Sequence, residues 1–237
     1  MNLSQAIEVF VGGLTATRSQ THPYVAQRVD GMRVLQDALG RKHERKIKVI
    51  SQGKTPEQVV TAIKNTSIGW HFVCDIHTDY EGVIEPRQLY KALGYRALST
   101  EWMFVHPLQN IPNHTSLPPV RLVTHQSELH SLPKYASQPL KLMPGSRLFL
   151  IWDEDRVYGF VRNIDVDENG WVSGLFVKPD VRGQGYGRAL MSSLLQSDHA
   201  TGLKTSVLLA NSAGARLYPH LGYQQIAVLQ MFCPKER

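Results

Sequence analysis

Three glycines at alternate positions, Gly183, Gly185 and Gly187, constrain this chain more than any other feature. They follow an apolar segment that ends at Val177 and precede apolar residues at helical spacing, which predicts a tight turn from a strand into a helix. Glycine has no Cβ, so the backbone can bend there and approach a ligand closely. The first amides of the following helix have no partners within it, and the helix dipole adds partial positive charge. Such a turn is shaped to hold a phosphate or a pyrophosphate.

The spacing of the residues around these glycines separates two kinds of phosphate ligand. A dinucleotide-binding fold places G-x-G-x-x-G in an early strand–helix unit. Here Arg188 stands where the third glycine would fall, and the turn lies late in the chain. The pattern R-x-x-G-x-G, at Arg182, Gly185 and Gly187, resembles instead the acetyl-CoA pyrophosphate loop of the GNAT acetyltransferase superfamily. A generic strand-to-helix turn remains the alternative.

A second segment, residues 211–223, resembles the same superfamily. Its pattern is N-x-x-A-x-x-L-Y-x-x-x-G-F/Y, except that Gly214 stands where alanine is usual. The resemblance implies that Asn211 binds the cofactor and that Tyr218 is a general acid that reprotonates the departing CoA thiolate. This chemistry is reasonable, because a thiolate with a pKa of about 8.5 can accept a proton from a nearby phenol. The alternative is that Tyr218 only packs in the core.

The resemblance also implies a fold and a set of binding residues. The fold is α/β, with a GNAT-type mixed, largely antiparallel sheet flanked by helices. Phe176 and Val177 would contact the pantetheine arm of acetyl-CoA and polarise the acetyl carbonyl. The pyrophosphate would be bound by Arg182, Gly183, Gln184, Gly185, Tyr186, Gly187 and Arg188.

An internal repeat indicates a tandem organisation. The two copies are Leu89–Tyr95 followed by Met103 and Phe104, and Leu217–Tyr223 followed by Met231 and Phe232, with the same internal spacing. Residues 107–119 are rich in Pro and Asn and lack apolar periodicity, which predicts a linker. We therefore expect residues 1–106 to form a degenerate GNAT-like half without the CoA loop and residues 120–237 to form the acetyltransferase domain. Tyr90 repeats Tyr218 in the half without the loop, which supports an architectural role for this tyrosine.

Other patterns in the sequence are weaker. Gly53-Lys54-Thr55 would end a phosphate-binding P-loop, but its first glycine is missing. His71, Cys74 and His77 alternate across a predicted strand, so we expect no metal site. The basic cluster at residues 41–46 is expected to be solvated. The carboxylates nearest to the strand that ends at Val177 are expected in exposed turns, so no general base is evident.

Composition limits the class of protein. No apolar run approaches about 18 residues, so no membrane span is expected. Two cysteines are too few for a disulfide framework, which favours a reducing, cytoplasmic location. A net charge of +6 suits a polyanionic ligand such as CoA, and equally suits nucleic acid. Because no aromatic residues interleave with the basic cluster, nucleic acid is the less favoured partner.

We therefore expect acetyl transfer from acetyl-CoA, as co-substrate, to a primary amine. No cysteine or serine stands in a recognisable nucleophile setting, which favours direct attack within a ternary complex. The acceptor would be a small-molecule or peptide amine, and the protein a monomer or a homodimer. The competing class is a non-catalytic acyl-CoA-binding or regulatory protein, which the missing base and the half without a loop both favour.

Overall fold

A computed structural model describes residues 1–39, 45–66, 68–79, 84–111, 118–130, 141–154 and 156–235. The chain forms two compact units. The C-terminal unit comprises Val105–Leu208 and Arg216–Gln224, together with Met1. The N-terminal unit comprises Asn2–Phe104, Leu209–Ala215 and Gln225–Arg237.

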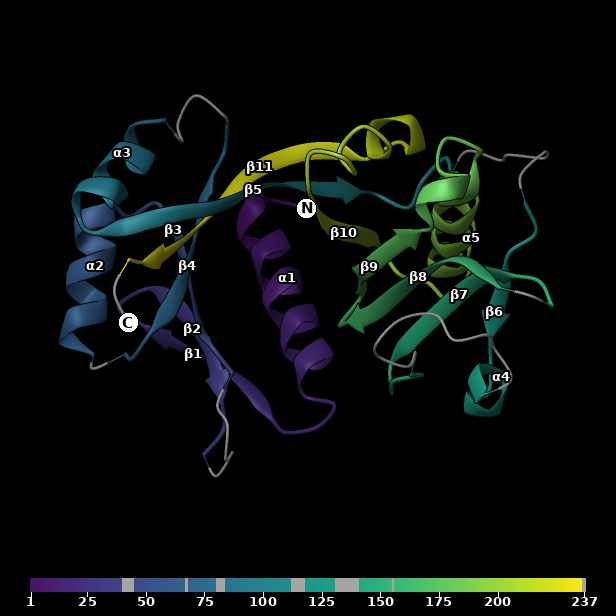
Figure 1. Cartoon of the computed structure of the whole chain (residues 1–237), viewed down its shortest axis with the longest axis horizontal. Helices are drawn as coiled ribbons and strands as arrows, with labels where there is room; N and C mark the ends of the chain where they lie inside the picture. The colour runs from purple at the N-terminus through teal and green to yellow at the C-terminus, as the bar shows by residue number, and fades with distance from the viewer. Residues whose placement is uncertain are drawn as a thin grey trace. The chain divides into compact units, whose positions relative to one another are not determined.

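The described residues of the C-terminal unit form five strands in the order β6-β7-β8-β9-β10 (Figure 1). Its elements are β6 (Arg121–Val123), α4 (Gln126–His130), β7 (Ser146–Trp152), β8 (Val157–Val166), β9 (Asn169–Val177), the 3₁₀ helix η2 (Pro179–Val181), α5 (Tyr186–Ala200), β10 (Thr205–Ala210) and the 3₁₀ helix η3 (Tyr218–Leu221). Neighbouring strands are antiparallel except for β9 and β10, which are parallel. Helix α5 packs across β7, β8 and β9. Buried apolar side chains of β6, β7 and β8 pack together in one cluster.

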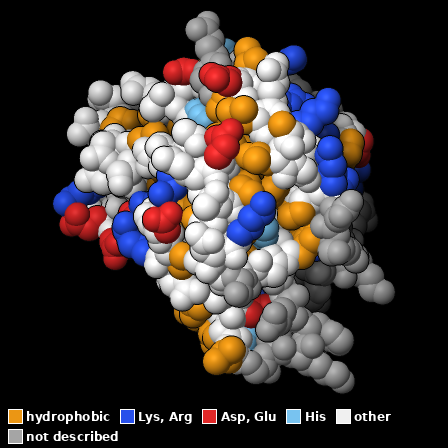
Figure 2. All heavy atoms as spheres, turned by 90° about the vertical axis from the view of Figure 1, so that its left-hand side faces the viewer, with side chains coloured by type: hydrophobic (Ala, Val, Ile, Leu, Met, Phe, Trp, Pro, Cys, Tyr) orange, Lys and Arg blue, Asp and Glu red, His pale blue; other side chains and the backbone are white. Residues whose placement is uncertain are grey.

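In the N-terminal unit, the part of the chain that the structure describes forms six strands in the order β1-β2-β3-β4-β11-β5. Its elements are α1 (Leu3–Arg18), β1 (Tyr24–Val29), β2 (Met32–Asp37), β3 (Ile47–Gln52), α2 (Pro56–Asn65), β4 (His71–His77), α3 (Ile84–Ala92), β5 (Tyr95–His106) and β11 (Gln224–Pro234). Apolar side chains of α2 and α3 pack with those of β3, β4 and β11 in one core. Figure 2 shows the side of the molecule that carries α2 and α3, where apolar groups are small and acidic and basic side chains are interspersed.

Local sequence signals explain where the main helices begin. Helix α1 starts with a capping box between Asn2 and Gln5, in which each side chain accepts a hydrogen bond from the other residue's amide. Helix α2 starts with the same device between Thr55 and Gln58, and Pro56 occupies its first turn, where no amide is needed. The sequence predicts a helix over residues 3–18 and another that begins at Thr55 or Pro56, and both starts agree with the structure.

The fold class predicted from the sequence is confirmed, because both units combine helices with largely antiparallel strands. Strand β1 was not predicted, since its exposed middle shows no apolar alternation. The sequence also predicts a helix over residues 212–221, and this prediction is wrong, because turns precede the short η3. The physical reason is Pro219, which has no amide hydrogen and would remove a hydrogen bond from a longer helix. Another helix is predicted over residues 126–135, which the structure describes as far as His130. Residues 112–117 of the predicted linker lie outside the described residues.

The last strand of the chain belongs to the N-terminal unit. Strand β11 pairs antiparallel with β4, from Val228 opposite His77 to Phe232 opposite Val73. It lies between β4 and β5, which are far from it in sequence. The expected linker at residues 107–119 and the expected common origin of the two halves therefore stay predictions. The two compact units each combine segments that are far apart in the sequence.

Candidate active site

The glycine turn adopts the conformation that its sequence predicts. Gly183 and Gly185 have φ angles of +79° and +87°, in the left-handed region that favours glycine. Gly185 is the N-cap of α5 and provides no side-chain cap, and the first intrahelical bond runs from the Ala189 amide to the Gly185 carbonyl, at 2.9 Å. The amides of residues 186–188 therefore have no helical acceptor, and no acidic residue lies in the first turn. A helix N-terminus of this kind suits an anion.

Charged side chains frame this turn. Arg182 and Arg188 are exposed, and the Arg182 Nε donates to the Val177 carbonyl at 3.0 Å. The nearest acid, Asp180, is engaged by Arg156 at 2.5 Å, and that hydrogen bond lowers the pKa of the Asp180 carboxyl. Gln184 Nε2 donates to the Asp180 carbonyl at 3.3 Å, which ties the turn to η2. The local balance of charge favours a polyanion.

Strands β9 and β10 separate just before the turn. They pair in parallel only over three residue pairs, which end at Val207 opposite Trp171. Strand β9 continues for six more residues to Val177, and β10 continues to Ala210. The edge of β9 that faces β10 therefore carries backbone groups without a strand partner, next to the glycine turn.

The strand register identifies which residues of β9 present those backbone groups. Lys178 donates its amide hydrogen to the Tyr158 carbonyl, at 2.8 Å, and Phe176 lies opposite Phe160. Since directly opposed residues of antiparallel strands alternate between hydrogen-bonded and non-bonded pairs, the backbone groups of Phe176 point to β8. Those of Leu175 and Val177 point to the separated edge. The predicted backbone contact with a ligand therefore fits Val177 and adds Leu175, whereas Phe176 offers its side chain. Sequence analysis missed Leu175, which counting in steps of two from Val177 would have found.

Two irregularities shape this part of β9. The β8–β9 register shifts between Arg162 and Asn163, so that Ser173 is an extra residue on β9. On β8, a Cβ atom at Gly159 would lie 2.6 Å from the Phe176 carbonyl oxygen and 3.1 Å from Leu190 of α5. Only glycine allows β9 and α5 to approach β8 this closely.

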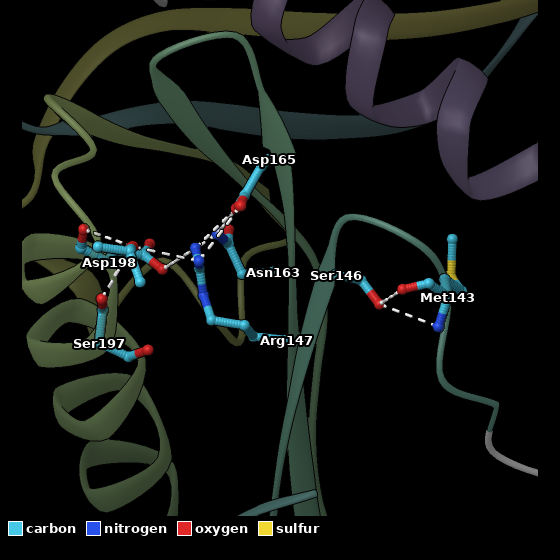
Figure 3. A network of polar contacts seen from close by, with 8 residues as sticks. Met143, Ser146, Arg147, Asn163, Asp165, Ser197 and Asp198 are labelled. Carbon is cyan, nitrogen blue, oxygen red and sulfur yellow. Dashed lines mark hydrogen bonds and ion pairs between the residues drawn. The ribbon is translucent and has the colours of Figure 1, made fainter. Parts of the chain in front are cut away.

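The polar network at the other end of α5 holds the helix on the sheet (Figure 3). Arg147 of β7 lies 2.6 Å from Asp165 of β8 and 2.8 Å from Asp198 of α5. Asn163 donates to Asp198 at 3.0 Å. Burial raises the pKa of Asp198 to about 7, although Arg147 acts in the opposite direction. Asn163 follows the register shift directly, so the network also fixes the irregular part of β8.

Tyr218 lies in η3, which packs against α5. The side chain of its neighbour Leu217 is 3.4 Å from where a Cβ on Gly187 would stand. Tyr218 is 5% exposed and its ring meets that of Tyr223 edge-on, with centroids 5.5 Å apart. Burial raises the pKa of the Tyr218 hydroxyl to about 12, so the phenol stays protonated in the physiological range.

The N-terminal unit repeats the tyrosine geometry without the open edge. Tyr90 is fully buried, its ring is 5.7 Å from that of Tyr95, and Gly94 has φ +88°, the same value as Gly222. However, the corresponding parallel strands β3 and β4 stay paired over six residues, up to Gln52 opposite Ile76. Similar tyrosines therefore occur with and without a separated edge, and the edge is what distinguishes the two units.

The other residues considered for binding, catalysis or metal ligation have weaker support. Asn211 accepts a hydrogen bond from the Gly214 amide at 2.9 Å and belongs to the N-terminal unit, so its role in binding stays a prediction. His106 is buried, and its Nδ1 accepts from the Leu108 amide at 2.9 Å, which leaves it unsuited to act as a base. The His71 Nε2 is hydrogen-bonded to the Tyr95 hydroxyl at 2.8 Å.

Across the described ranges, no three His, Cys, Asp or Glu residues are grouped as a metal site. No helix in those ranges is both long and apolar enough to cross a bilayer.

Comparisons with known proteins agree with this fold. Residues 144–225 match the acetyltransferase (GNAT) domain family. A GCN5-related N-acetyltransferase from Kribbella flavida has a similar fold, with a TM-score of 0.68 and 14% identity over 100% of this chain and 97% of its own. One from Sphaerobacter thermophilus gives a TM-score of 0.55 and 15% identity, over 84% of this chain and 76% of its own. No curated protein sequence matches the chain.

The fold and the open strand edge together define an acyltransferase-type α/β domain. Residues 144–225 belong to the GNAT acetyltransferase domain family, and the solved structures share the fold of the chain. The family match supports acyl transfer as the general class of reaction.

Proposed function

We propose that the protein transfers an acetyl group from acetyl-CoA to a primary amine by direct attack. The amine nitrogen forms a bond to the carbonyl carbon, and the carbon–sulfur bond breaks. The amine loses one proton, and the departing CoA thiolate gains one, so that an amide and free CoA result. The observation that carries the proposal is the separated edge of β9, which ends at the uncapped N-terminus of α5.

Each part of acetyl-CoA has a matching group in the C-terminal unit. The pyrophosphate suits the free amides after Gly185, with Arg182 and Arg188 beside them. The pantetheine arm carries amide groups, which suit the unpaired backbone groups of Leu175 and Val177. A backbone N–H on this edge would also stabilise charge that develops on the carbonyl oxygen.

We propose that Tyr218 interacts with the departing CoA thiolate, and the pKa of the Tyr218 hydroxyl indicates how. Moving a proton from a phenol with a pKa of about 12 to a thiolate with one of about 8.5 is uphill by roughly 5 kcal/mol. Tyr218 therefore acts chiefly by donating a hydrogen bond to the sulfur, and the thiolate takes its proton later from solvent. No carboxylate or histidine lies on β9, so the amine loses its proton through water.

The test compares the wild type with Tyr218→Phe. Acetyl-CoA binding is measured by calorimetry, and turnover by release of the CoA thiol across a panel of amines. We expect kcat to fall about 10- to 100-fold with little change in acetyl-CoA affinity, because a hydrogen bond to a charged group contributes roughly 1.5–3 kcal/mol. Tyr90→Phe is the matched control and should leave turnover unchanged. Equal turnover in Tyr218→Phe and the wild type would remove Tyr218 from the mechanism.

The competing proposal is an acyl-CoA-binding protein without catalysis. It is favoured by the absence of a carboxylate or histidine on β9. Wild-type protein that binds acetyl-CoA but acetylates no amine in the panel would establish this second function and exclude the first.

We also propose that the N-terminal unit is a degenerate copy that does not bind CoA. The six paired residues of β3 and β4 support this, because they use the backbone groups that would otherwise meet pantetheine. A cytoplasmic location is proposed as well, supported by two cysteines, Cys74 and Cys233, that are unpaired and buried. Calorimetry that shows two acetyl-CoA sites per chain would contradict the first of these proposals.

A further inference from the structure

The sheet face of the C-terminal unit opposite α5 carries a half-buried aromatic pair beside the separated edge. Phe160 and Phe176 are directly opposed on β8 and β9, and their rings stack with centroids 6.0 Å apart at an interplanar angle of 21°. The opposite face is assigned to α5 because Gly159 and Val177, the neighbours of these two residues, meet α5 side chains or its first turn. An acceptor that enters from this side would meet aromatic surface first.

Gly174 leaves space in front of that pair. It lies on the same face of β9 as Phe176, two residues earlier, and opposite Arg162 on β8. A Cβ atom at Gly174 would find one neighbour within 4 Å, Phe160 Cε2 at 3.9 Å. Gly174 therefore leaves the surface between the aromatic pair and Arg162 free of a side chain.

Arg162 brings a cation to this space, and no acidic side chain in the described part of the chain forms an ion pair with it. Its Nη2 donates to the Lys141 carbonyl at 3.2 Å, whereas its buried Nε has no acceptor among the described residues. No described carboxylate forms an ion pair with it: Asp165 of β8 pairs with Arg147, Asp180 with Arg156, and Glu168 with Lys204. Residues 131–140, which lie outside the described residues, contain no Asp or Glu in their sequence. Burial lowers the pKa of Arg162, because desolvation disfavours the charge, but a guanidinium still stays protonated at neutral pH.

A half-buried cation without a partner is costly unless a ligand supplies the anion. A guanidinium offers a planar fork that matches a carboxylate, and a single positive charge balances a single carboxylate. We propose that Arg162, with Phe160, Phe176 and Gly174, forms the acceptor subsite and selects an aromatic or flat apolar amine that also carries a carboxylate. This inference rests on the proposed acetyl transfer and names its acceptor class.

The experiment measures acetylation of matched acceptor pairs at saturating acetyl-CoA. Each aromatic amine is offered as the carboxylate and as the carboxamide: 3- and 4-(aminomethyl)benzoate with their amides, and phenylalanine with phenylalaninamide. We expect wild-type kcat/KM to favour the carboxylates by about 10- to 100-fold, the range of a charge-assisted hydrogen bond. Arg162→Gln should abolish this preference, and Arg162→Lys should restore part of it. Arg121→Gln, which removes an arginine stacked on Trp152 at 4.7 Å, is the matched control and should keep the full preference.

The outcomes separate this inference from the proposed function. Equal use of acids and amides by the wild type, or a preference that survives in Arg162→Gln, overturns the subsite while acetyl transfer stands. If no amine is acetylated, acetyl transfer fails, and calorimetry with the same pairs in the presence of acetyl-CoA decides on the subsite. Carboxylate-selective binding that disappears in Arg162→Gln then supports it, and binding without selectivity overturns it.

Discussion

Replacing Asp198 by asparagine should remove a specific part of the pH dependence of stability. The folded protein keeps a proton on Asp198 up to about pH 7, because burial raises its pKa, while the unfolded chain loses that proton at its ordinary pKa of about 3.8. Because the folded state binds more protons in this range, this group makes the fold less stable as the pH rises through it. Between about pH 5 and about pH 8 the linkage amounts to roughly 3 kcal/mol of unfolding free energy.

The assay is urea unfolding followed by tryptophan fluorescence at several pH values over that range. Trp152 and Trp171 report on the C-terminal unit. We expect the free energy of unfolding of the wild type to fall relative to that of Asp198→Asn by roughly 3 kcal/mol across the range, because the amide does not titrate. Asp180→Asn is the control: Asp180 is exposed and its pKa is lowered, so its titration lies below this range. A wild-type and variant difference that stays constant from about pH 5 to about pH 8 would refute the reasoning.

Two glycine substitutions test the geometry of the site. Gly159→Ala should cost about 1–3 kcal/mol of unfolding free energy, since its Cβ would lie 2.6 Å from the Phe176 carbonyl oxygen, and Gly69→Ala, with nothing within 4 Å, is the control in the same urea assay. Gly185→Ala should weaken acetyl-CoA binding measured by calorimetry and cost about 1 kcal/mol or more of stability, because φ is +87° there; unchanged affinity would show that the turn does not need this conformation to bind the ligand.

The glycine turn could be predicted from sequence because its determinants are local. Positive φ at Gly183 and Gly185, and a helix that begins without a side-chain cap, both follow from residue types at short spacing. The superfamily was recognised on the same residues, and the family match over residues 144–225 confirms it. The fold class is confirmed as well, since apolar periodicity located most of the strands and helices.

The open edge of β9 could not be predicted, because strand pairing joins residues distant in sequence. Nothing in the residues 205–210 indicates that their pairing with β9 ends at Val207. The alternation that adds Leu175 depends on which pairs are hydrogen-bonded, and a single register shift reverses it. Arg162 was likewise missed, since an arginine on a strand is ordinary until its lack of an anionic partner is seen in three dimensions.

The position of β11 has a consequence for synthesis of the chain. Residues 224–234 fill the position between β4 and β5, so the sheet that contains β1 is completed by a strand translated more than 100 residues after β5. Until β11 leaves the ribosome, β4 and β5 each expose a row of unpaired backbone groups to other chains. The N-terminal unit therefore cannot complete its sheet before residues 224–234 are translated, and a nonsense codon shortly before residue 224 would harm the first half of the protein as well as the second.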